Sequence, residues 1–111
     1  MKKNGQNNFF SNIPPKMTGE IVEDILTTGS VRIERIISHG DSLPENFWYD
    51  QDENEWVIVL QGQAKLLIDG EIEPVTLDSG DYINIPKHVK HQVIWTTPKI
   101  ATIWLGVFYG D

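Results

Sequence analysis

From residue 30 to residue 108 the sequence is a succession of short apolar segments, many of which alternate with polar residues and end near glycine or proline. Alternation with a period of two indicates β-strands that bury one face. The segments lie at residues 31–37, 56–60, 64–68, 75–77, 82–85, 89–95 and 100–108. Many short strands with almost no helix between them predict an all-β sandwich or barrel.

Glycine and proline mark the joints between these segments. Gly62 interrupts the chain after residues 56–60, and residues 64–68 then alternate as the hairpin partner of that strand. Asp69-Gly70 is a strong turn signal, because a type I′ turn needs positive φ at both central positions. Pro74 indicates an edge strand or a bulge.

The first part of the chain has a different character. Residues 1–17 are rich in Asn, Gly, Lys and Pro and predict an N-terminal extension, followed by a single domain over residues 18–111. The apolar residues between Gly19 and Leu26 stand at i, i+1, i+4 and i+5, which favours one short helix there.

Two later segments resemble the motifs of the cupin superfamily, G(x)5HxH(x)3,4E(x)6G and G(x)5PxG(x)2H(x)3N. Glu55 and Gly62 stand at the E(x)6G spacing of the first motif. Gly80, Pro86 and His91 stand at the G(x)5P and histidine positions of the second. The resemblance, to small single-domain bacterial cupins, covers roughly residues 30–108 and implies a jelly-roll β-barrel.

The chain departs from these motifs at several positions. With the longer spacing of the first motif, its two histidines fall on Trp48 and Asp50, and its leading glycine on Gly40 after a slightly longer gap. In the second motif His88 replaces the glycine and Trp95 replaces the asparagine. Two of the four ligand positions that the family uses are therefore kept.

A cupin carries its metal at the barrel mouth, so the resemblance implies a ligand set of Asp50, Glu55 and His91. Two carboxylates and one imidazole suit Mn²⁺ or Fe²⁺, with Zn²⁺ as a further candidate. Trp48 cannot bind a metal and leaves a position for water or substrate. The alternative is that His91, on a strand whose other side chains of the same parity are Val93 and Trp95, is a core histidine.

Five further residues are candidates for the site. His88 and Tyr49 are candidate proton-transfer groups, with a solvated loop position as the alternative for His88. Arg35 shares the parity of the apolar side of its strand, so it either pairs with a carboxylate or binds an acidic substrate. Trp48 and Trp95 are candidate substrate-binding rings, with packing in the core as the alternative.

Composition limits the partners and the compartment. The net charge of −7, with nine basic residues, argues against nucleic-acid and anionic-membrane partners. The chain has no cysteine, which excludes disulfides and thiolate chemistry. Lys2 and Lys3 are followed by polar residues instead of an apolar signal segment, and no apolar run is long enough for a membrane span, so we expect a cytoplasmic protein.

Three functions remain open from the sequence. The first is a metal-dependent dioxygenase, isomerase or lyase-like cupin acting on a small polar or acidic metabolite. The second is a metal-free module that binds a sugar or another small molecule. The third is a structural homodimer, to which exposed Trp48-Tyr49 and the apolar C-terminal strand would contribute an interface. The cupin fold hosts many chemistries and does not choose among these.

Overall fold

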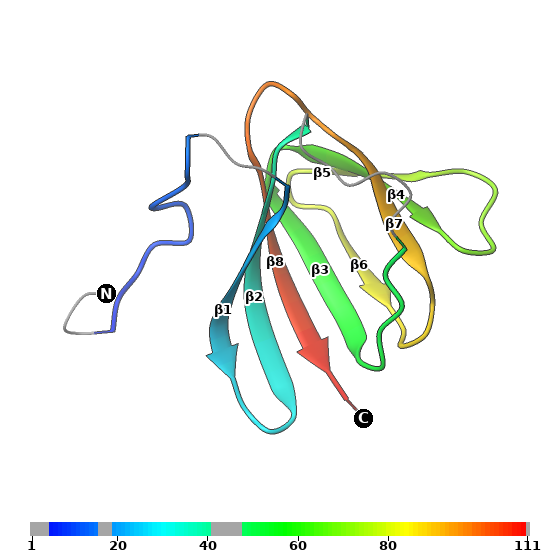
Figure 1. The fold of residues 1–111 in the computed structure, drawn as a ribbon, viewed down its shortest axis with the longest axis horizontal. Helices are drawn as coiled ribbons and strands as arrows, with labels where there is room; N and C mark the ends of the chain where they lie inside the picture. The colour runs from blue at the N-terminus through cyan, green and yellow to red at the C-terminus, as the bar shows by residue number, and fades with distance from the viewer. Residues whose placement is uncertain (1–4, 16–18, 41–47, 111) are drawn as a thin grey trace.

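The computed structural model describes residues 5–15, 19–40 and 48–110. Eight strands lie within these residues: β1 (Ile21–Thr27), β2 (Val31–Ser38), β3 (Asn54–Gln61), β4 (Gln63–Ile68), β5 (Val75–Asp78), β6 (Tyr82–Ile85), β7 (His91–Thr96) and β8 (Thr102–Tyr109). They form a five-stranded sheet in the order β1-β2-β8-β3-β6 and a three-stranded sheet in the order β5-β4-β7 (Figure 1). The pairs are antiparallel. The predicted all-β jelly roll is confirmed, although the two sheets do not close into one continuous barrel.

The hydrophobic core lies between the facing sides of the two sheets. The larger sheet contributes alternate residues of β3, β6 and β8, and the smaller sheet contributes residues of β4 and β5. Its buried members are Val57, Val59, Ala64, Leu66, Leu77, Ile85 and Trp104. Burying a large apolar side chain contributes roughly 1.5–3 kcal/mol, so this cluster holds the sheets together.

The helix predicted between Gly19 and Leu26 is wrong, because these residues form β1. β1 pairs with β2 from Ile21 opposite Ile37 to Thr27 opposite Arg32. A bulge between Asp24 and Leu26 shifts the register. The backbone pairing with β2 outweighs the helical spacing of a short segment.

The predicted hairpin between residues 56–60 and 64–68 is also wrong. β3 pairs with β6 and β8, whereas β4 pairs with β5 and β7. The chain passes from one sheet to the other at Gly62, whose φ is +93°. A Cβ atom at Gly62 would lie 2.5 Å from Oγ1 of Thr102, so this crossing requires glycine.

The Asp69-Gly70 turn is confirmed, but its predicted type is wrong. The N–H of Glu71 donates to the carbonyl of Ile68 at 2.9 Å. Gly70 has a φ of +92°, while Asp69 is not among the described residues with positive φ. One positive φ at the second central position is typical of a type II turn.

The outer face of β2 meets the N-terminal segment. The Arg35 guanidinium donates to the carbonyl oxygens of Phe9 and Ser11 at 3.0 and 2.6 Å, and to Glu23 at 2.7 Å. Residues 5–15 therefore contact the domain, while the predicted boundary at residues 17 and 18 lies outside the described residues. Within the described part of the chain there is no helix with the length and apolar character needed to span a membrane.

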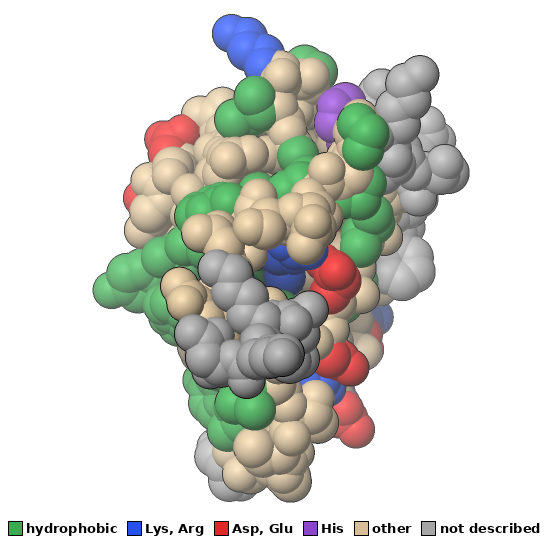
Figure 2. All heavy atoms as spheres, turned by 90° about the vertical axis from the view of Figure 1, so that its left-hand side faces the viewer, with side chains coloured by type: hydrophobic (Ala, Val, Ile, Leu, Met, Phe, Trp, Pro, Cys, Tyr) green, Lys and Arg blue, Asp and Glu red, His purple; other side chains and the backbone are tan. Residues whose placement is uncertain are grey.

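The C-terminal strand β8 lies in the middle of the larger sheet, between β2 and β3. Its backbone is paired on both sides, and most of its side chains are buried or half-buried. Its backbone is therefore not free to pair with a second copy, and the use of its outer face in an interface stays a prediction. The edge strands of the same sheet are β1 and β6, and β1 lies on the side of the molecule that faces the viewer in Figure 2.

Candidate functional site

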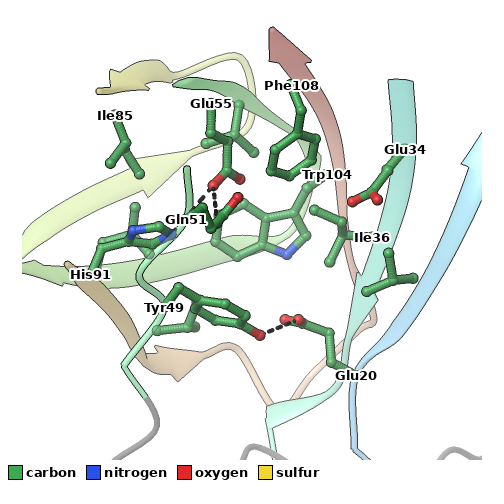
Figure 3. Close-up of a pocket in the computed structure, with 14 residues that line it drawn as sticks. Glu20, Glu34, Ile36, Tyr49, Gln51, Glu55, Ile85, His91, Trp104 and Phe108 are labelled. Atoms are coloured by element: carbon green, nitrogen blue, oxygen red, sulfur yellow. Dashed lines mark hydrogen bonds and ion pairs between the residues drawn. The ribbon is translucent and has the colours of Figure 1, made fainter. Parts of the chain in front are cut away.

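A cavity of about 80 Å³ opens between the two sheets (Figure 3). Apolar side chains from both sheets form most of its wall, and polar side chains from several elements reach into it. The polar ones are Glu20, Glu34, Tyr49, Gln51, Glu55 and His91. One buried water needs roughly 10–15 Å³, so the cavity has room for several waters or for part of a small ligand.

A short backbone bridge brings the segment before β3 to the cavity. Tyr49 and His91 exchange two backbone hydrogen bonds of 2.7 and 3.1 Å, and their rings stack with centroids 5.3 Å apart. In an extended segment successive side chains point to opposite sides. Tyr49 and Gln51 accordingly line the cavity, whereas Trp48 and Asp50 do not.

Glu55 and His91 come from opposite sheets and meet in the wall of the cavity, which brings together two of the three residues in the ligand set that the resemblance implied. Glu55 lies on β3 in the larger sheet and His91 begins β7 in the smaller one. Nε2 of His91 lies 3.3 Å from Oε1 of Glu55, and the side chains are 7% and 9% exposed. Gln51 donates its side-chain amide to the same oxygen of Glu55 at 3.1 Å.

The other ring nitrogen of His91 also meets an oxygen. Nδ1 lies 3.3 Å from the carbonyl of Val89, which accepts hydrogen bonds only. This contact is a hydrogen bond when Nδ1 carries the proton. The Glu55 carboxyl group and Nε2 of His91 are close enough for a proton to pass between them.

A chain of polar contacts fixes Tyr49 from the opposite side. Its hydroxyl donates to Oε1 of Glu20 at 2.8 Å, and Oε2 of Glu20 accepts from the Ser38 hydroxyl at 3.0 Å. The Trp104 indole N–H donates to the oxygen of Ser38 at 3.2 Å. Burial, and then the Glu20 carboxylate, raise the pKa of Tyr49 well above its usual range. Tyr49 is thus a neutral hydroxyl and not a base at neutral pH.

Glu34 on β2 supplies another buried carboxylate. It is 8% exposed, and its Oε2 accepts from Nε of Arg32 at 2.8 Å. Burial raises the pKa of Glu34, and the neighbouring guanidinium of Arg32 offsets this only in part.

A wider, open depression adjoins the cavity and forms its mouth. The two share Val22, Glu34, Tyr49, Gln51 and Phe108. The depression adds a set of charged side chains from β2 and from the loops before β3 and β7. These are Arg32, Asp50, Asp52, Glu53 and His88.

His88 and Asp50 interact with each other at this mouth and do not enter the cavity. Nδ1 of His88 lies 3.2 Å from Oδ1 of Asp50, and both side chains are about half exposed or more, at 66% and 46%. The backbone N–H of His88 donates to the carbonyl of Gln51 at 2.7 Å. His88 keeps a φ of +63° at the position where the cupin motif has glycine.

The remaining predicted residues lie away from the cavity. Arg35 is on the outer face of β2, where it pairs with Glu23, which is the carboxylate pairing that the sequence left open and not a position in the cavity. Trp48 is 40% exposed and lines a separate surface depression.

Trp95 also points away from the cavity, contrary to the parity argument. β7 pairs Val93 with Leu66 and Trp95 with Lys65, and the register shifts between these two pairs. This bulge reverses the alternation after Val93 and turns Trp95 outward, where the Lys65 ammonium lies 5.4 Å from its ring centroid.

The side chains at this site do not fit the predicted metal. Among the described residues no group of three His, Asp or Glu side chains lies close enough together to hold an ion. Asp50 pairs with His88, and Glu55 and His91 contact each other. A divalent metal stays a prediction from the resemblance alone.

The shorter spacing of the first motif explains this geometry. When three residues separate the second histidine position from the glutamate, the two histidine positions fall on Tyr49 and Gln51. These two side chains line the cavity beside Glu55. Sequence reasoning missed Gln51 because it used the longer spacing. It missed Glu20 because a carboxylate inside an expected helix gave no signal.

Comparisons with known proteins agree with the fold. The model of the family Cupin_2, a cupin domain, matches residues 34–108. The crystal structure of a "putative mannose-6-phosphate isomerase" from Ralstonia eutropha JMP134 is 36% identical, with a TM-score of 0.89 over 96% of this chain and 98% of that one. No curated protein matches the chain.

Two more distant structures support the fold alone. A cupin superfamily protein from Desulfitobacterium hafniense DCB-2 is 16% identical, with a TM-score of 0.70 over 89% of this chain and 84% of that one. An RmlC-like cupin with a double-stranded β-helix fold from Methanocaldococcus jannaschii is 17% identical, with a TM-score of 0.67 over 87% and 85%. Because the family model matches well over half of its length, the chain belongs to the cupin domain family Cupin_2.

Proposed function

We propose that the cavity binds a small sugar-type metabolite and moves a proton on it. The observation that carries this proposal is the buried contact between Glu55 and His91, 3.3 Å apart in the wall of a cavity. A carboxylate and an imidazole that share a proton form a general acid–base pair. In the interior of a closely packed core, such a pair would be surrounded by other side chains. Here it lines a cavity that a ligand can enter.

The chemistry that this pair supports is isomerisation beside a carbonyl group. Glu55 takes the proton from the carbon next to the carbonyl, and His91 gives its proton to the carbonyl oxygen, which produces an enediol. His91 then takes the proton of the neighbouring hydroxyl, and Glu55 returns its proton to the former carbonyl carbon. No oxidant or reductant is needed, because one proton leaves and one arrives at each step.

The other polar groups have positioning roles in this proposal. Gln51 holds the Glu55 carboxylate through its amide. Tyr49 keeps its proton and packs its ring against His91, which fixes the plane of the imidazole. The similarity to the Ralstonia eutropha structure, which carries the name of a sugar isomerase, supports a sugar-type ligand.

Exchange of substrate protons with solvent tests this proposal. We would incubate the protein in D₂O with a panel of aldoses and ketoses and follow deuterium at the carbons beside the carbonyl by NMR. The wild type should incorporate deuterium in the presence of EDTA, and Glu55→Gln should slow this by about 100-fold or more. Glu71→Gln, an exposed residue outside the cavity, is the matched control.

Two results would contradict the proposal. If no sugar of the panel exchanges or binds, the cavity is not a sugar-type site. If exchange occurs at equal rates in the wild type and in Glu55→Gln, the pair does not act on the ligand.

A further inference from the structure

The polar wall of the cavity is acidic. Three carboxylates, those of Glu20, Glu34 and Glu55, line it, and no Lys or Arg lines it among the residues that the structure describes. Within the described ranges, Glu20 accepts hydrogen bonds from the Tyr49 and Ser38 hydroxyl groups. Glu34 contacts Arg32 and Glu55 contacts His91, so Glu20 is the cavity carboxylate for which the described residues supply only neutral partners.

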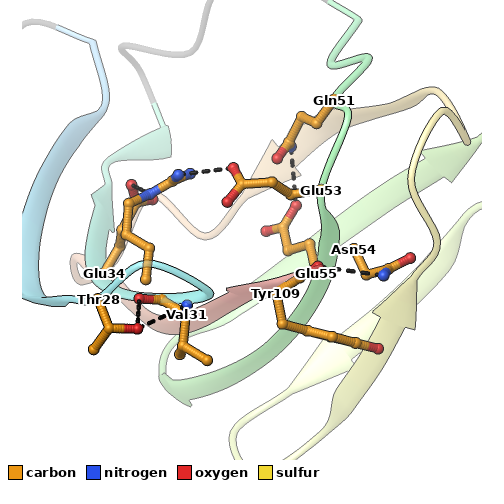
Figure 4. Close-up of polar contacts among 9 residues, drawn as sticks. Thr28, Val31, Glu34, Gln51, Glu53, Asn54, Glu55 and Tyr109 are labelled. Carbon is orange, nitrogen blue, oxygen red and sulfur yellow. Dashed lines mark hydrogen bonds and ion pairs between the residues drawn. The ribbon is translucent and has the colours of Figure 1, made fainter. Parts of the chain in front are cut away.

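The mouth adds more negative charge than positive charge. Around the depression stand the carboxylates of Glu34, Asp50, Asp52 and Glu53, against the single guanidinium of Arg32 and the His88 imidazole. Nε of Arg32 is bonded to Glu34 at 2.8 Å and its Nη1 to Glu53 at 2.7 Å. The carboxylates of Glu34 and Glu53 are labelled in Figure 4. His88 is bonded to Asp50. Both basic groups of the mouth are thus already paired with carboxylates.

Aromatic faces complete the environment. Trp104 and Phe108 on β8 and Tyr49 from the bridge line the cavity (Figure 3). The guanidinium of Arg32 already lies 4.4 Å from the centroid of the Phe108 ring. Carboxylates combined with aromatic faces favour organic cations through ion pairing and cation–π attraction.

We propose that this cavity selects its ligand by charge: it takes a small sugar-type metabolite that bears an amine, and it rejects the phosphorylated counterpart. The inference rests on the proposed function, since it names the ligand class of the same cavity. It separates this chain from the sugar phosphate in the name of the Ralstonia eutropha protein. A phosphate group would face like charges at the mouth and inside, a juxtaposition that lowers affinity.

Three ligands that share one sugar skeleton and differ in charge test the selection: mannosamine, mannose and mannose-6-phosphate. We would measure their binding by titration calorimetry at slightly acidic pH, where the amine is protonated, at low and at high salt. Affinity should fall in that order, with mannose-6-phosphate at least about tenfold weaker than mannosamine. High salt should reduce the difference in affinity between mannosamine and mannose-6-phosphate, because the charges of the mouth are open to solvent and are screened by salt.

A single substitution tests the origin of the selection. Glu53→Gln removes one carboxylate from the mouth and releases one side of the Arg32 guanidinium. It should strengthen binding of mannose-6-phosphate relative to mannosamine by several-fold. Glu73 is exposed and lies outside the mouth, so Glu73→Gln should leave the ratio of the two binding affinities, for mannose-6-phosphate and for mannosamine, unchanged.

The outcomes separate this inference from the proposed function. If mannose-6-phosphate binds as tightly as mannosamine or more tightly, charge selection is wrong while a sugar-type site stands. If the ratio does not respond to Glu53→Gln or to salt, the mouth does not select by charge. If none of the three binds and no other sugar exchanges its protons, the proposed function itself fails.

Discussion

Tyr49 is held at both ends of its side chain. Its ring stacks on His91, and its hydroxyl donates to Glu20, which is in turn bonded to Ser38. Removing the hydroxyl leaves an oxygen of the half-buried Glu20 carboxylate without its donor, so we expect Tyr49→Phe to lower the free energy of unfolding by about 1–3 kcal/mol.

Urea unfolding would measure this loss. The control is Tyr82→Phe, because Tyr82 is 65% exposed on β6 and its substitution should cost much less. Equal effects of the two substitutions would show that the contact between Tyr49 and Glu20 contributes nothing to stability.

The raised pKa of Glu34 predicts how the free energy of unfolding depends on pH. Burial raises its pKa above the ordinary value of 4.5, so the folded state holds a proton more tightly than the unfolded state. The penalty for the buried charge is fully present at neutral pH and is relieved as pH falls through the raised pKa toward 4.5. The stability of the wild type relative to Glu34→Gln should therefore improve as pH is lowered over this window.

Urea titrations of both proteins at several pH values measure this difference. A difference that stays constant across the window, or that changes in favour of Glu34→Gln as pH falls, would contradict a raised pKa in the folded state.

At the scale of single residues, the sequence could identify a side chain of the cavity where the alternation of a strand and a family motif agreed. Glu55 and His91 met both conditions, and they face each other. Trp95 failed because a bulge reverses the parity of β7 after Val93, and no residue type announces that bulge. Glu20 was beyond prediction because its contact with Tyr49 joins residues 29 positions apart.

At the scale of elements, the crossing at Gly62 fixes how the two sheets meet. Its φ of +93° disfavours any other residue, and an added Cβ would lie 2.5 Å from Oγ1 of Thr102. We expect Gly62→Ala to lower the free energy of unfolding by about 1–3 kcal/mol. Gly29→Ala is the control, since nothing lies within 4 Å of a Cβ at that position and its φ is not in the strained range.

Thermal or urea unfolding of the two variants decides this prediction. A loss no larger in Gly62→Ala than in Gly29→Ala would show that the crossing tolerates a side chain.

The positions of most strands were predictable, but their pairing was not. Alternation and turn residues located the segments now seen as β2 to β8. Pairing depends on contacts between distant segments, such as β2 with β8 and β4 with β7. Local patterns carry little information on these contacts, which is why residues 56–60 and 64–68 were wrongly expected to form a hairpin.

At the scale of the whole molecule, the homodimer stays a prediction. β1 is an edge strand, and Val22, Ile25 and Leu26 on it are 52–53% exposed. Unpaired edges with apolar side chains favour pairing with a second copy. We expect a dimer in sedimentation experiments at micromolar concentration, weakened by Ile25→Lys. A monomer in the wild type would contradict this.

The central claim of the proposal is that the four cupin positions hold an acid–base set, Tyr49, Gln51, Glu55 and His91, joined by side-chain contacts, instead of a metal site. Tyr49→His combined with Gln51→His would turn this set into three imidazoles and one carboxylate around one cavity. Such a set suits Mn²⁺, Fe²⁺ or Zn²⁺. The control combines Trp48→His with Asp50→His, which places the same residues outside the cavity.

Elemental analysis of the three purified proteins after incubation with Mn²⁺, Fe²⁺ or Zn²⁺ and removal of excess ion tests this claim most directly. We predict about one bound ion in the Tyr49→His, Gln51→His protein and far less than one in the wild type and the control. A wild type that retains a full equivalent of metal, and loses it in Glu55→Gln, would contradict the account.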